Sequence, residues 1–128
     1  MRKGLLLLAA VSGFMATALG AFGAHGLKSV ASDELIAIFN LGVQYHFYHT
    51  FALITVALTS HVIRSRLLSW AAYLFIAGIG LFSGSLYLYA LTGTKWLGAI
   101  TPMGGVCFLM GWLLLAAAVW RNRVVDGQ

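Results

Sequence analysis

The stretch Gln44–His49, which reads Gln-Tyr-His-Phe-Tyr-His, opens a long apolar run and decides how the chain must fold. Five of its six side chains carry a polar atom, and none carries a fixed charge. A membrane interior offers such groups no water, so each must find a partner within protein. At about 100° per residue, all five share one broad arc of a helix. We therefore expect this arc to face other helices.

The composition indicates a membrane protein. Of the 128 residues, 61% are hydrophobic and 9% are charged, whereas an ordinary soluble domain has about 25% charged residues. So short a chain cannot bury this much apolar surface in its own core, and the excess must face lipid. The net charge of +5 comes from short basic pairs at the ends of apolar runs, not from a basic helix face. We therefore expect the lipid bilayer and other membrane helices as partners, and no nucleic acid.

Four apolar runs predict an all-α membrane protein, a four-transmembrane-helix bundle that forms a single domain. The expected spans are about 5–24, 41–63, 67–91 and 101–120. Ser32 followed by Asp33 and Glu34 is typical of a helix N-terminus. A helix from there to Arg64 would be about 48 Å long, which exceeds a hydrocarbon core of about 30 Å. We therefore expect a short interfacial helix that bends near Gly42 into the second span.

The first apolar run also has features of a secretory signal peptide, because Arg2 and Lys3 precede four leucines and small residues follow. Its length is nearer the ~20 residues of a span than the 7–15 residues of the hydrophobic region of a signal peptide. We expect the run to be retained as the first span.

The basic residues predict the orientation. In a four-span arrangement six of them fall on one side and two on the other, so the positive-inside rule places both termini in the cytoplasm. The six are Arg2, Lys3, Arg64, Arg66, Arg121 and Arg123, and the two are Lys28 and Lys95.

Small residues recur at the spacing that lets membrane helices approach closely. The third span carries them on two faces, one with Gly80 and Gly84 and the other with Gly78 and Ser85, so we expect it to pack between two neighbours. Phe51, on the apolar side of the second span, should face lipid. The expected helix-contact residues are Gly13, Gly20, Gly80, Ser83, Gly84, Tyr87 and Gly104.

Three motifs resemble one known family. Gly20–Leu27 reads Gly-Ala-Phe-Gly-Ala-His-Gly-Leu, Gln44–His49 follows it, and Ser83–Tyr87 reads Ser-Gly-Ser-Leu-Tyr. Together they resemble the YgdD-like family of small bacterial inner-membrane proteins, a domain-of-unknown-function family with small transmembrane relatives in animals. The resemblance extends over nearly the whole chain. It implies a multi-span protein of the bacterial inner membrane whose first helix is retained, and it implies no activity.

The candidate site is a polar cluster inside the membrane. His46 and His49 are three residues apart, and His25 ends the preceding span, so the imidazoles could converge on a metal ion or a haem. Alternatively, the cluster is structural and specifies helix packing through hydrogen bonds. The cluster consists of His25, Gln44, Tyr45, His46, Tyr48 and His49.

Two functional classes follow from these patterns. No span contains a carboxylate, and signatures of a nucleophilic serine or a phosphate loop are absent, so we expect no enzyme. For the histidine cluster we favour the structural role, and we therefore expect no cofactor and no metal. The first class is a structural or accessory membrane protein that acts through helix contacts, as a homo-oligomer or with another membrane protein. The alternative is a small-solute or ion permease lined by the polar stripe from Gln44 to Thr59, which would need an oligomer to enclose a pore.

Overall fold

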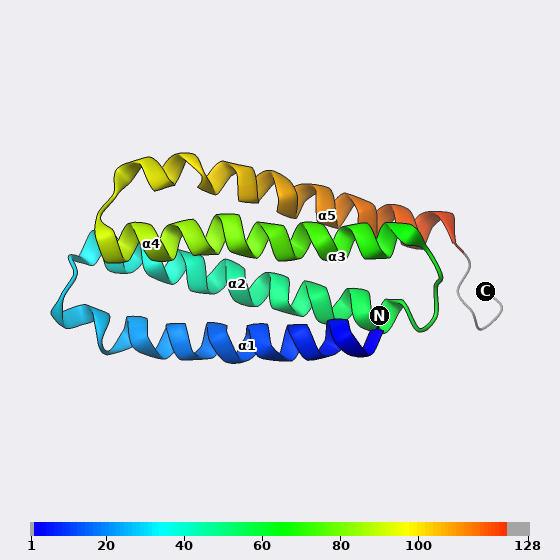
Figure 1. The fold of residues 1–128 in the computed structure, drawn as a ribbon, viewed down its shortest axis with the longest axis horizontal. Helices are drawn as coiled ribbons and strands as arrows, with labels where there is room; N and C mark the ends of the chain where they lie inside the picture. The colour runs from blue at the N-terminus through cyan, green and yellow to red at the C-terminus, as the bar shows by residue number, and fades with distance from the viewer. Residues whose placement is uncertain (1, 123–128) are drawn as a thin grey trace.

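The computed structural model describes residues 2–122, which form four long helices in antiparallel order (Figure 1). The first two are α1 (Arg2–Ala24) and α2 (Asp33–Thr59). The third is built from α3 (Arg66–Gly78), the π-helical turn η2 (Ile79–Ser83) and α4 (Gly84–Thr92), and the fourth is α5 (Thr101–Arg121). Short 3-10 helices, η1 (Leu27–Ser29) and η3 (Lys95–Ala99), lie in two connections. The predicted all-α, four-helix architecture is confirmed.

Local sequence signals account for three of the helix ends. The Ser32 hydroxyl accepts a hydrogen bond from the Leu35 amide at 3.2 Å, as predicted for the start of α2. Ser65 caps α3 in the same way. Helix α4 ends at Gly93, whose φ of 70° is a left-handed conformation that glycine adopts without strain.

Three segments of the described chain are long and apolar enough to cross a membrane: Lys3–Ser29, Arg66–Thr92 and Lys95–Arg121. Helix α2 is equally long, with 27 residues, but the polar residues of Gln44–Thr50 lower its hydropathy. It nevertheless runs antiparallel beside α1 and the third helix (Figure 1). This packing supports a fourth crossing, with the start of α1 and the end of α5 at the same end of the bundle.

The predicted bend into the second span is wrong. Helix α2 continues through Gly42 without interruption, so the residues before Gly42 belong to the same helix as the second span. The reason is packing. The Tyr87 ring lies where a Gly42 side chain would be, and the Ser83 hydroxyl donates to the Gly42 carbonyl at 2.7 Å. The neighbouring helix thus fills the space that the glycine leaves and holds the backbone helical.

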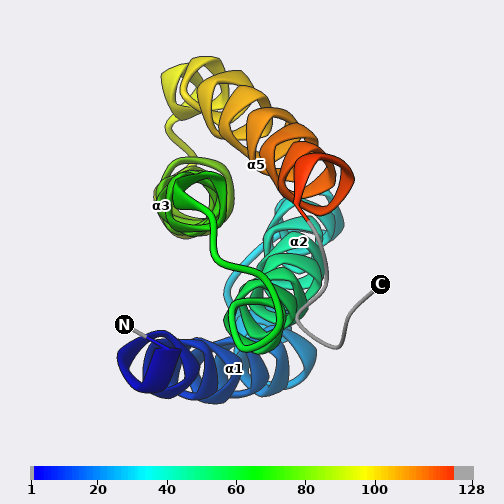
Figure 2. The same cartoon turned by 90° about the vertical axis from the view of Figure 1, so that its right-hand side faces the viewer.

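Helix α2 is the centre of the bundle. One side packs against α1, and another packs against α3, η2 and α4 (Figure 2). The third helix also packs against α5 through α3 and η2, so it lies between two neighbours. The residues at the core of these contacts include Leu53, Val56 and Phe75, all almost completely buried.

The glycines divide into covered and uncovered positions. A side chain at Gly104 would collide with the backbone of Phe82, and one at Gly111 would collide with the Phe75 ring. Gly13 and Gly20 of α1 lie against Thr50 and Val43 of α2. These glycines bring the helix axes close together.

Gly80 and Gly84 correct the sequence prediction. A Cβ atom at either position would meet nothing within 4 Å, so neither glycine makes a close contact within the described chain. The two glycines share one face with Tyr87, as their spacing predicted, but no neighbouring helix of the described chain covers that face closely at either glycine. Ser83 takes the buried position against α2 instead.

Candidate functional site

The polar stretch of α2 divides between two separate networks. The first surrounds His46, which is buried. Its Nδ1 lies 2.8 Å from the Tyr87 hydroxyl on α4, and its Nε2 lies 3.0 Å from the Ser12 hydroxyl on α1. Ser12 is also hydrogen bonded to Thr50, at 2.6 Å. One imidazole therefore connects three helices.

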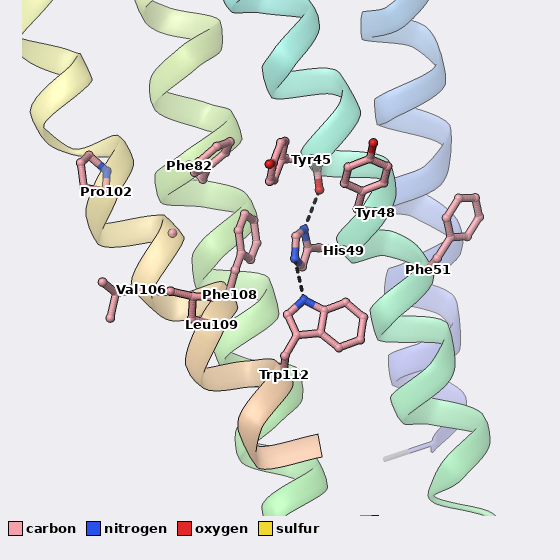
Figure 3. A pocket seen from close by; sticks show the side chains of 11 residues that line it. Tyr45, Tyr48, His49, Phe51, Phe82, Pro102, Val106, Phe108, Leu109 and Trp112 are labelled. Carbon is pink, nitrogen blue, oxygen red and sulfur yellow. Dashed lines mark hydrogen bonds between the residues drawn. The ribbon is translucent and has the colours of Figure 1, made fainter. Parts of the chain in front are cut away.

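The second network surrounds His49, which is also buried but is directed toward α5 (Figure 3). Its Nδ1 lies 2.8 Å from the backbone carbonyl oxygen of Tyr45, and its Nε2 lies 3.1 Å from the indole nitrogen of Trp112. The ring stacks on Phe108 at a centroid distance of 3.5 Å and an interplanar angle of 5°.

The partners of His49 determine its tautomer. An indole N–H only donates, so Nε2 must accept and carry no proton. A carbonyl oxygen only accepts, so Nδ1 must carry the proton. His49 is thus a neutral imidazole with a fixed orientation.

Three of the predicted cluster residues lie elsewhere than expected. His25 is exposed at the end of α1, and its side chain makes no hydrogen bond within residues 2–122. Gln44 and Tyr48 are also exposed, and the Gln44 amide donates to the Tyr48 hydroxyl at 2.6 Å. The polar arc spans about 200° of the helix, and the neighbouring helices cover only part of it. Gln44 and Tyr48, which lie at one edge of the arc, are hydrogen bonded to each other instead.

The arrangement limits what the histidines can do chemically. Both ring nitrogens of His46 and both of His49 have hydrogen-bond partners, so binding a metal ion or haem would require breaking one of these bonds. Within residues 2–122, no three His, Cys, Asp or Glu side chains converge on a possible metal position. The polar stripe proposed for a pore is also divided, because Thr55 is exposed whereas Ala52 is buried.

The sequence prediction missed two direct partners of the histidines, Ser12 and Trp112, and it missed Thr50, which is hydrogen bonded to Ser12. Each is a polar side chain within an apolar helix. The rule that intramembrane polar groups need partners could have identified them as candidates. It could not have paired them, because pairing depends on how the helices are arranged.

Two grooves flank α2. The α2–α5 groove has a volume of about 720 Å³ and contains His49 and Trp112 in its wall (Figure 3). The α1–α4 groove, about 290 Å³, lies over a different face of α2 and contains Ser12, His46 and Tyr87. Apolar side chains form nearly all of the surface of both grooves.

Four apolar antiparallel helices, with the polar groups of the central helix hydrogen bonded to its neighbours, define a multi-span integral membrane protein. The chain belongs to the family described as "Protein of unknown function (DUF423)", whose model matches residues 19–105. This result confirms the family suggested by the sequence motifs.

Relatives extend the similarity over almost the whole chain. The UPF0382 membrane protein YwdK of Bacillus subtilis is 42% identical over 117 residues, which cover 91% of this chain and 95% of that protein. A UPF0382 membrane protein of Haemophilus influenzae is 38% identical over 127 residues, covering 96% and 98% of the two chains. No solved structure matches the chain. The predicted location in a bacterial membrane, with several spans, is confirmed.

Proposed function

We propose that this chain is a non-enzymatic accessory membrane protein, which acts by packing a helix of a second copy into its α1–α4 groove. The observation that supports this proposal most directly is the uncovered pair Gly80 and Gly84. Both glycines line the groove, and a side chain at either would meet no atom within 4 Å. Glycine lowers the stability of a helix unless a neighbouring backbone uses the space that it leaves.

The surface around the two glycines fits an apolar helix. On the α1 side the groove is bounded by Leu8, Val11 and Met15, which are 42%, 48% and 49% exposed. Lipid chains and apolar helix faces are about equally apolar, so close van der Waals packing would drive the association of two such helices. The glycines allow this packing because they let the second helix approach the backbone of the third helix.

The polar side chains support a role without catalysis. His46 and His49 have hydrogen-bond partners at both ring nitrogens, which leaves neither as a free base or nucleophile. The carboxylates of the described residues are Asp33 and Glu34, in the first turn of α2 and outside its apolar part. General acid–base chemistry would need such groups beside a bound substrate.

The test is the oligomeric state of the full chain in lipid nanodiscs and in mild detergent. We expect a dimer or larger assembly for the wild-type protein and a monomer for the double variant Gly80→Leu and Gly84→Leu. Helical content should be unchanged, because the new side chains enter open space in the isolated chain.

Gly4→Leu is the matched control. Gly4 is also an exposed helical glycine with nothing within 4 Å of its Cβ position, but it lies outside the groove. This variant should keep the wild-type assembly. A wild-type protein that remains monomeric at every protein-to-lipid ratio would refute the proposal.

A further inference from the structure

The α2–α5 groove has a chemical character of its own. Six of its eleven lining residues are Phe, Tyr or Trp, and none is charged. Its volume of about 720 Å³ falls within the range of about 300–1,000 Å³ that is typical of small-molecule sites. The absence of a cation from its lining disfavours an anionic headgroup such as phosphate, which would need an opposite charge or several donors.

Two phenol groups give the groove its hydrogen-bonding capacity. The Tyr45 hydroxyl has no partner within residues 2–122, although its half-buried ring forms part of the groove wall. The Tyr48 hydroxyl accepts from Gln44, so its own hydrogen remains available for donation. The two rings are in contact, with centroids 5.4 Å apart. In the apolar interior of a membrane both O–H groups need an acceptor from protein or ligand, because a hydrocarbon core does not supply water.

The aromatic side chains favour a flat ligand. The Tyr45 ring lies 4.7 Å from Phe82, and Phe82 lies 5.5 Å from Phe108. Figure 3 shows these rings along one wall, followed by His49 and Trp112. Flat rings pack on such surfaces in offset or edge-to-face contacts, which a flexible saturated chain cannot make.

We propose that the α2–α5 groove binds an uncharged, lipid-soluble molecule with a flat ring and carbonyl oxygens, which is the chemistry of a membrane quinone. Its ring lies among Tyr45, Phe82 and Phe108, and one carbonyl oxygen accepts a hydrogen bond from the Tyr45 hydroxyl. The apolar tail leaves through the open side of the groove into the bilayer. This site is on a different face of α2 from the α1–α4 groove, so either proposal can fail without the other.

The binding test uses the fluorescence of Trp112, which lines the groove. In a full-chain protein in nanodiscs, the exposed residues Trp70, Trp96 and Trp120 are replaced by Phe, and decylubiquinone is titrated. We expect saturable quenching of Trp112. A second protein that retains only Trp120, which is 89% exposed and outside the groove, measures quenching by quinone merely dissolved in the bilayer.

Two variants of the Trp112-only protein test the position of the ligand. Tyr45→Phe removes one hydroxyl and should weaken binding roughly five-fold, which corresponds to one neutral hydrogen bond. Gly105→Leu should abolish saturation, because Gly105 lines the groove and its Cβ position is 4.0 Å from the nearest atom of Phe82. Tyr73→Phe, at an exposed tyrosine outside the groove, should leave the affinity unchanged.

Three results would overturn the proposal. One is linear quenching that is equal in the Trp112-only and Trp120-only proteins. Another is saturable binding that Tyr45→Phe and Gly105→Leu leave unchanged while both variants keep their helical content. The third is a phospholipid or a second copy that occupies the groove and that decylubiquinone does not displace, as measured by native mass spectrometry.

Discussion

His46 and His49 are one helical turn apart on α2, yet they contribute to different parts of the molecule. His46 bonds to hydroxyl groups on α1 and α4, so its network is closed and joins three helices. His49 bonds to a half-exposed indole on α5 and forms part of the wall of the α2–α5 groove. Residues with the same chemistry and nearly the same depth can therefore differ in role, because their angular position selects a different neighbouring helix.

The largest loss of stability is expected where α5 packs on the third helix. Gly104→Leu forces a side chain into the backbone of Phe82 and should destabilise the fold by about 3 kcal/mol. The free energy of unfolding in mixed micelles measures this loss. The adjacent variant Gly105→Leu is the control, because its Cβ position is in ordinary contact and the cost should be much smaller. Equal losses would mean that α5 does not pack on η2 as described.

The next largest loss of stability is expected when His46 is replaced, and replacing His49 is the comparison. His46→Leu leaves the hydroxyls of Ser12 and Tyr87 without their shared partner and should cost about 1–2 kcal/mol of unfolding free energy. His49→Leu should cost less, because Trp112 is 43% exposed and the Tyr45 carbonyl belongs to the helix. A larger loss for His49→Leu would reverse the roles assigned to the two networks.

A double-mutant cycle sharpens the account of the His46 network. Ser12→Ala and Thr50→Val each remove a hydroxyl from one 2.6 Å hydrogen bond. Their coupling energy should be about 0.6 kcal/mol, as is common for interhelical hydrogen bonds in membranes. Strictly additive unfolding free energies would indicate that the two hydroxyls do not interact.

The smallest effect is expected at the lipid-facing surface. Phe51 is 59% exposed, and the sequence predicted that it faces lipid. Phe51→Leu exchanges one apolar side chain for another and should change the unfolding free energy by less than about 0.5 kcal/mol. A clear destabilisation in the same micelle assay would show that the faces of α2 are assigned wrongly.

The sequence predicted the helices well and the contacts only in part. Apolar length and the Ser32 cap were sufficient to predict the number of helices and the start of α2. The spacing of Gly80 and Gly84 indicated a shared face, but it could not show whether a neighbouring helix of the chain covers that face. From the polar stretch we predicted that His46 and His49 face other helices. The sequence did not predict that they belong to separate hydrogen-bond networks, because that depends on where α1, α4 and α5 lie.

The tautomer of His49 tests the central claim most directly, since it depends on the separate network with Trp112. Solid-state ¹⁵N NMR of the protein in bilayers, with signals assigned by comparison with the His49→Gln variant, distinguishes a protonated ring nitrogen from an unprotonated one. We predict a protonated Nδ1 and an unprotonated Nε2 for His49, with the Nε2 signal shifted in the Trp112→Phe variant. A protonated Nε2, or a signal that Trp112→Phe leaves unchanged, would contradict the division of the polar stretch into two networks.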